Sequence, residues 1–108
     1  MARAHNRVPD AYIEDLCFDA QQAAEKALKA LMIRRGIDFP YIHDLARLMD
    51  ILEAQGERIP ATVQRAVRLT RYAVSTRYPG PQEPVTEQDY AEAIELAEGV
   101  LRWAEDNL

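Results

Sequence analysis

The chain has 108 residues, 48% of them hydrophobic and 29% charged, with a net charge of −5 at pH 7. This length and composition are those of one globular domain with a single core, which excludes a disordered or fibrous chain and predicts one domain over 1–108. The negative charge argues against a general nucleic-acid coat. Charges interrupt every apolar stretch and no apolar signal core follows the N-terminus, so we expect no membrane span and a cytoplasmic location.

The first predicted helix covers about 10–35. Its apolar side chains recur at steps of three and four residues, and Gly36 follows two arginines as a C-terminal stop. Cys17 falls on this apolar stripe, so we expect a buried thiol without a chemical role. One cysteine and two histidines do not make a zinc site, and we expect no metal and no other cofactor.

Three further helices are predicted, at about 43–55, 60–77 and 86–107. Asp44 suits the first turn of the second helix, and Thr86 with Asp89 approximates a capping box for the last. The three prolines and one glycine of 78–84 predict a stiff connection. The predicted fold is therefore all-α, an up-and-down four-helix bundle of two long and two shorter helices, with apolar surface left for a homodimer.

Charge is unevenly distributed along the chain. Residues 65–77 contain four arginines and no acidic residue, whereas residues 83–108 contain eight acidic residues and one arginine. The molecule is therefore expected to be electrically polarised.

A narrow polar stripe on the third predicted helix is the best candidate site. At 100° per residue the stripe consists of Gln64, Arg68, Arg71, Ser75 and Tyr78. Arginines spaced in this way can bind phosphates through forked hydrogen bonds, and a tyrosine can stack on a base. The alternative interpretation is a solvated face that pairs with the acidic last helix.

A second polar set lies on the first predicted helix. It consists of Gln21, Gln22, Glu25, Lys26 and Lys29. Glu25 and Lys29 are in the favourable order four residues apart, and ordinary helix solubility explains the set. His43, next to Asp44, is more readily explained as a packed or capping imidazole than as a catalytic group.

The stretch Asp-Leu-Cys-Phe-Asp-Ala-Gln-Gln-Ala-Ala-Glu-Lys-Ala-Leu-Lys-Ala-Leu, residues 15–31, closely resembles the first long helix of HEPN domains. The likeness continues through Gly-Ile-Asp-Phe-Pro (36–40), His-Asp-Leu (43–45), Thr-Arg-Tyr-Pro-Gly (76–80) and Val-Thr-Glu (85–87). It spans nearly the whole chain in the right order.

The resemblance implies a helical bundle that commonly dimerises and is often encoded beside a minimal nucleotidyltransferase, as a toxin and antitoxin or a nucleotide-handling pair. The resemblance also implies a possible activity, because many HEPN proteins are metal-independent ribonucleases. Their signature motif is an arginine, then four to six residues, then a histidine. In a subset, the partner enzyme adenylates a tyrosine two positions after that histidine.

The segment Arg71-Tyr-Ala-Val-Ser-Thr76-Arg-Tyr78 matches the arginine and the tyrosine of this motif, but Thr76 stands at the histidine position and no histidine follows Arg71. Loss of a general acid or base typically costs a factor of about 10²–10⁴. The resemblance therefore implies weak or absent catalysis and makes Tyr78 a candidate modification site. The residues expected to bind a nucleotide or RNA are Arg68, Arg71, Ser75, Arg77 and Tyr78.

Three functions stay open at this point. The first is a nucleotide-binding, RNA-binding or interaction subunit paired with a minimal nucleotidyltransferase. The second is a metal-independent toxin ribonuclease with Arg71 and Tyr78 as catalytic residues. The third is a purely structural dimeric bundle whose arginines balance the acidic last helix.

Overall fold

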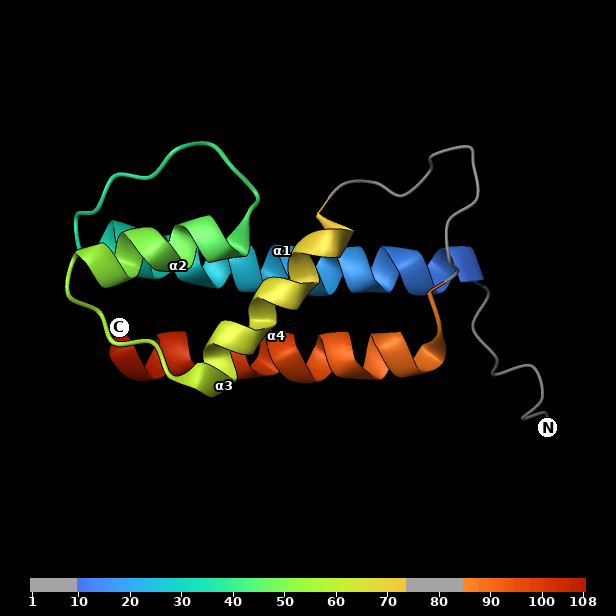
Figure 1. Ribbon diagram of the computed structural model, residues 1–108. Coiled ribbons are helices and arrows are strands. Elements are labelled where there is room, and N and C mark those ends of the chain that lie inside the picture. The colour runs from blue at the N-terminus through green and yellow to red at the C-terminus, as the bar shows by residue number, and fades with distance from the viewer. Residues whose placement is uncertain (1–9, 74–84) are drawn as a thin grey trace.

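The computed structural model describes residues 10–73 and 85–108, and this part of the chain contains helices and no strand (Figure 1). The elements are α1 (Asp10–Arg34), α2 (Leu45–Ala54), α3 (Ala61–Gln64), the 3₁₀ helix η2 (Arg65–Tyr72) and α4 (Glu87–Asn107). The predicted all-α helical bundle is confirmed. Among the described residues, no helix has the length and apolar character needed to cross a bilayer.

The two long helices α1 and α4 lie side by side and make the most extensive contact in the molecule (Figure 1). The η2 helix crosses them obliquely and packs against both, while α2 packs on α1 and η2. One core cluster joins all of these elements. This arrangement positions one face of η2 and the start of α2 over the same helix, α1.

Both glycine stops end their helices as left-handed caps. Gly36 has φ +70°, and its N–H and that of Ile37 donate to carbonyls of the last turn of α1 at 3.1 and 2.9 Å. Gly56, at φ +98°, ends α2 in the same way. A positive φ is strained for any residue with a Cβ, which explains glycine at these two positions.

The predicted N-terminal caps are also present. The Asp44 carboxylate accepts from the Ala46 N–H at 3.0 Å and caps α2. Thr86 and Asp89 form a reciprocal capping box on α4, with both hydrogen bonds at 3.0 Å. The hydrogen bond from the Thr86 backbone holds the pKa of Asp89 below its usual value, against the opposing effect of burial.

The third predicted helix differs from expectation in its winding. It is α-helical only over Ala61–Gln64 and becomes a 3₁₀ helix over Arg65–Tyr72, a long run for this type of helix. The physical reason lies in a repeat of three: every third side chain is buried, and a helix with three residues per turn places such residues on one side. The buried residues are Val63, Ala66, Leu69 and Tyr72.

Candidate functional site

The 3₁₀ winding aligns Arg65, Arg68 and Arg71, which we call the arginine row. They are three residues apart, and all three are exposed, a third of a turn around η2 from its buried residues. Successive members are separated by about 6 Å along the helix axis, given a rise of roughly 2 Å per residue. A projection at 100° per residue instead predicts one stripe for Gln64, Arg68 and Arg71, but the Gln64 amide donates to Glu53 and to the Ile59 carbonyl, both at 3.0 Å.

The members of the arginine row differ in their partners. Arg68 Nη1 lies 3.1 Å from Glu92 Oε2 on α4, and the Arg71 guanidinium lies 4.9 Å from the centroid of the Tyr72 ring. Within residues 10–73 and 85–108, neither Arg65 nor Arg71 forms an ion pair. Among the described residues, one arginine therefore pairs with the acidic helix, and the other two have no carboxylate within ion-pair distance.

Sequence reasoning missed a buried polar group on α1. Gln21 is 0% exposed and Glu25 is 4% exposed, so the prediction that solubility explains these two residues is wrong. With Lys29 and His43 they form what we call the Glu25 cluster. A burial signal was present, because Cys17, Gln21 and Glu25 follow one another at steps of four along the apolar stripe.

Glu25 is the acceptor at the centre of its cluster. Its carboxylate accepts from Gln21 Nε2 at 3.0 Å and from Lys29 Nζ at 2.7 Å. His43 Nδ1 lies 3.0 Å from Oε1 and 3.1 Å from Oε2 of the same carboxylate. Burial alone would raise the pKa of Glu25, but the hydrogen bonds from Lys29, Gln21 and His43 outweigh it and hold that pKa below its usual value.

A family model for the HEPN domain matches residues 1–107. The chain belongs to the HEPN domain family. Comparison with curated proteins and with solved structures gave no match.

In this HEPN domain the structure places only part of the predicted motif. Arg68 and Arg71 lie together on η2. Ser75, Thr76, Arg77 and Tyr78 lie outside the described residues. The interpretation of Tyr78 as a catalytic or modified residue therefore stays a prediction.

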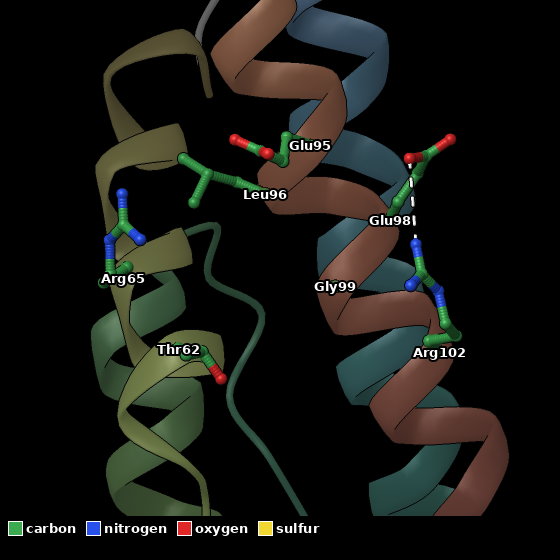
Figure 2. A pocket seen from close by; sticks show the side chains of 7 residues that line it. All are labelled: Thr62, Arg65, Glu95, Leu96, Glu98, Gly99 and Arg102. Carbon is green, nitrogen blue, oxygen red and sulfur yellow. Dashed lines mark ion pairs between the residues drawn. The ribbon is translucent and has the colours of Figure 1, made fainter.

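A hollow of about 390 Å³ lies between the α3–η2 segment and α4 (Figure 2). Its lining residues are Thr62, Arg65, Glu95, Leu96, Glu98, Gly99 and Arg102. Arg102 Nη2 lies 3.9 Å from Glu98 Oε1 on the same helix (Figure 2). Two arginines and two glutamates balance one another here, so the hollow does not favour an anion as the exposed arginine row does.

The buried side of η2 packs against α1 and thereby holds the helix that carries the arginine row in place. Tyr72 is 4% exposed and contacts Cys17, which is fully buried as predicted. Burial raises the pKa of Tyr72 to about 12 and also raises the pKa of Cys17. A neutral, buried thiol is a poor nucleophile, so Cys17 acts as a packing residue.

The Glu25 cluster lies close to the C-terminal half of η2 in this HEPN domain. The Leu45 N–H, two residues after His43, donates to the Thr70 hydroxyl at 3.2 Å, and Thr70 precedes Arg71. Gln21 also donates to the His43 carbonyl at 3.2 Å, one helical turn along α1 from the Cys17–Tyr72 contact. Among the described residues there is no group of three or more histidine, cysteine, aspartate or glutamate side chains that could hold a metal ion.

Proposed function

We propose that this HEPN domain is the RNA- or nucleotide-binding subunit of a toxin–antitoxin-like pair with a minimal nucleotidyltransferase, and that it acts in the cytoplasm as a homodimer. Membership of the HEPN family supports a nucleotide- or RNA-related function in general. The observation that carries the proposal further is the arginine row on η2.

The arginine row has the properties that a phosphate backbone requires. Its three guanidinium groups are exposed and regularly spaced, and guanidinium binds phosphate through two parallel hydrogen bonds. The Arg68–Glu92 pair is solvent-exposed, and such a pair contributes little to stability, so a phosphate can replace Glu92 at small cost.

Cleavage by the segment 71–78 itself is proposed to be weak or absent. Thr76 occupies the histidine position of the motif, and a threonine hydroxyl, unlike an imidazole, does not gain or lose a charge near neutral pH. The segment then contributes binding through Arg71 and, in the proposal, through Ser75, Arg77 and Tyr78.

One observation favours a second function, that of a purely structural bundle. Arg68 pairs with Glu92, as expected if the arginines only balance the acidic α4. Under this alternative, removing members of the arginine row leaves RNA binding unchanged.

Fluorescence anisotropy with a labelled single-stranded RNA, measured over a range of salt concentrations, tests the proposal. We expect binding that weakens with salt, with a log–log slope that falls in magnitude by about 0.7 in Arg71→Ala, because one phosphate contact is lost. Arg34→Ala, the same charge change at the exposed end of α1, is the matched control and should leave the slope unchanged. Absence of both RNA binding and a complex with a co-expressed minimal nucleotidyltransferase would refute it.

A further inference from the structure

A glycine in the wall of the hollow between the α3–η2 segment and α4 has no explanation within the fold. Gly99 lies inside α4 and, unlike Gly36 and Gly56, has no positive φ. Among the described residues, no atom beyond its two chain neighbours and the backbone of its own helix lies within 4 Å of the position that a Cβ would take. Glycine inside a helix is less stable than alanine. Gly99 therefore keeps space open although the helix is weakened by it.

The hollow has the size and the surroundings of a site for a small planar molecule. Its volume of about 390 Å³ lies in the usual range of ligand sites. The wall on α4 includes Gly99 and Leu96, which is only 7% exposed, so this part of the wall has no polar side chain. Charged side chains stand around it (Figure 2). The wall can therefore take the face of a flat ring, and the charged groups can bind the polar atoms at its edges.

Arg65 and Glu95 stand on opposite sides of this hollow (Figure 2). One winding further along η2, Arg68 pairs with Glu92 of α4 at 3.1 Å. Within residues 10–73 and 85–108, however, neither Arg65 nor Glu95 forms an ion pair. A forked donor and a forked acceptor are thus held apart across one cavity. A ligand with two adjacent acceptors and two adjacent donors can bind both.

Guanine is the base that matches both of these side chains. Its O6 and N7 are adjacent acceptors, and arginine binds them in the most common specific base contact. Its N1–H and N2–H are adjacent donors on the Watson–Crick edge, and one carboxylate accepts from both. Adenine, cytosine and uracil present alternating donors and acceptors and satisfy only one of the two side chains. Guanine is also neutral, in agreement with the balanced charge of the hollow.

We propose that the hollow binds an unstacked guanine of a single-stranded RNA whose phosphates are bound by the arginine row. Arg65 binds O6 and N7, Glu95 accepts from N1–H and N2–H, and the ring lies against Gly99. The proposal rests on RNA binding by the arginine row and adds a base preference to it. Arg65 belongs to both the row and the hollow, and Arg68 lies about 6 Å further along the axis of η2, so one ribose can connect a bound base to a bound phosphate.

A second copy of the chain is the competing occupant. A glycine on a helix face permits the close approach of another backbone. If α4 paired with its copy in an antiparallel, two-fold arrangement around Gly99, Glu95 of one copy would meet Arg102 of the other. Such a pairing gives no role to Arg65 or to the α3–η2 side of the hollow, so we favour the base.

Fluorescence anisotropy with two labelled oligouridines, one of which carries a single central guanosine, tests base recognition. We expect the strand with guanosine to bind about tenfold more tightly, the discrimination typical of a bidentate contact. Inosine at the same position lacks the N2 amino group and should lose part of this preference. 7-Deazaguanosine, which lacks N7, should lose part of it as well.

Gly99→Leu fills the hollow and is the main variant. It should abolish the preference for guanosine and leave binding of the plain oligouridine unchanged, because the arginine row is intact. Ala54→Leu makes a similar enlargement at an exposed position in the last turn of α2 and is the matched control, which should keep the preference.

Gly99→Ala separates a ligand role from a packing role. We expect its melting temperature to rise by about 4 °C, because alanine favours the helix, while the preference for guanosine falls. A lower melting temperature would mean that the fold itself requires this glycine, and would overturn the inference.

Variants of the charged groups separate base recognition from phosphate binding. Glu95→Gln exchanges an acceptor for a donor, so it should reduce the preference for guanosine over inosine. Arg65→Ala should reduce the preference for guanosine over 7-deazaguanosine. Arg71→Ala should weaken the binding of all strands by the same factor.

The outcomes distinguish the inference from the proposed function. If the wild-type protein binds both strands equally, or Gly99→Leu keeps the preference, the inference is overturned while the proposed function stands. If Gly99→Leu converts a dimer to a monomer in sedimentation and keeps the preference, the hollow belongs to a second copy. If the wild-type protein binds neither strand, the RNA binding on which both rest fails.

Discussion

The arginine row and the Glu25 cluster use charged side chains in opposite environments. Arg68 is 58% exposed and its partner Glu92 is 35% exposed, whereas the Glu25 side chain is 5% exposed in its pair with Lys29. Water screens the first pair and leaves its guanidinium available to a ligand. The second is desolvated, so its hydrogen bonds fix geometry. The exposed guanidinium groups can therefore bind a ligand, whereas the buried Glu25 carboxylate orients the side chains that donate to it.

The largest expected effect is that of removing the centre of the Glu25 cluster. Glu25→Ala takes the acceptor from Gln21, Lys29 and His43 together, and we expect the free energy of unfolding to fall by about 2–3 kcal/mol. Urea denaturation measures this change. Glu25→Gln keeps an acceptor oxygen and should lose less. If Glu25→Ala lowers the free energy of unfolding by no more than Arg68→Ala does, then the Glu25 cluster stabilises the fold no more than the arginine row.

A comparable effect is expected on the buried side of η2 at alkaline pH. Burial raises the pKa of Tyr72 from 10.0 to about 12, so the neutral phenol is favoured in the folded state. Its stabilisation is complete below about pH 10 and is lost as pH rises toward about 12, a total of about 2–3 kcal/mol at 1.36 kcal/mol per unit.

Tyr72→Phe is the matched variant for this prediction, because it keeps the ring and lacks the ionisable group. Between about pH 9 and about pH 12 the stability of the wild-type protein should fall relative to the variant by that amount. Parallel curves for the two proteins would show that Tyr72 ionises without cost and is therefore not buried in solution.

A smaller loss of stability is expected in acid, where it increases as pH falls rather than as pH rises. The pKa of Glu25 is lowered in the folded state, so its carboxylate stabilises the fold above its usual pKa and this contribution is lost as pH falls through the folded value. From about pH 6 to about pH 2 the wild-type protein should therefore lose more stability than Glu25→Gln. Equal losses would mean that Glu25 is hydrated like the carboxylates of α4.

The smallest effect on stability is expected in the arginine row. Arg68→Ala breaks an exposed pair with Glu92, and we expect less than about 0.5 kcal/mol in urea denaturation. The same variant should weaken RNA binding, and Arg34→Ala should change neither quantity. A large loss of stability in Arg68→Ala would favour the structural interpretation of the arginine row.

The sequence was sufficient for features with local causes. The ends of α1 and α2 follow from glycines that adopt positive φ, and the start of α4 follows from the reciprocal bonds of Thr86 and Asp89. These signals involve residues within one or two helical turns of each other, so they can be predicted from the sequence without knowledge of the tertiary structure.

Two features depended on contacts between distant residues and were not predicted. The 3₁₀ winding of η2 follows from burying Leu69 and Tyr72 in step with Ala66 against neighbouring helices, which overrides the α-helical tendency. The burial of Glu25 follows from the segment 37–44, which brings His43 back onto α1 across 18 positions of sequence. The sequence signal for this burial is the position of Gln21 and Glu25 on the apolar stripe of the first helix, but their polar side chains favour an interpretation as solvent-exposed residues.

The most direct test of RNA binding by the arginine row is an NMR titration of the ¹⁵N-labelled protein with a single-stranded RNA. If the arginine row binds RNA, chemical-shift changes should appear at Arg65, Arg68 and Arg71, with none at Arg34. Shift changes confined to other surfaces, or a protein whose spectrum does not change at all, would contradict it.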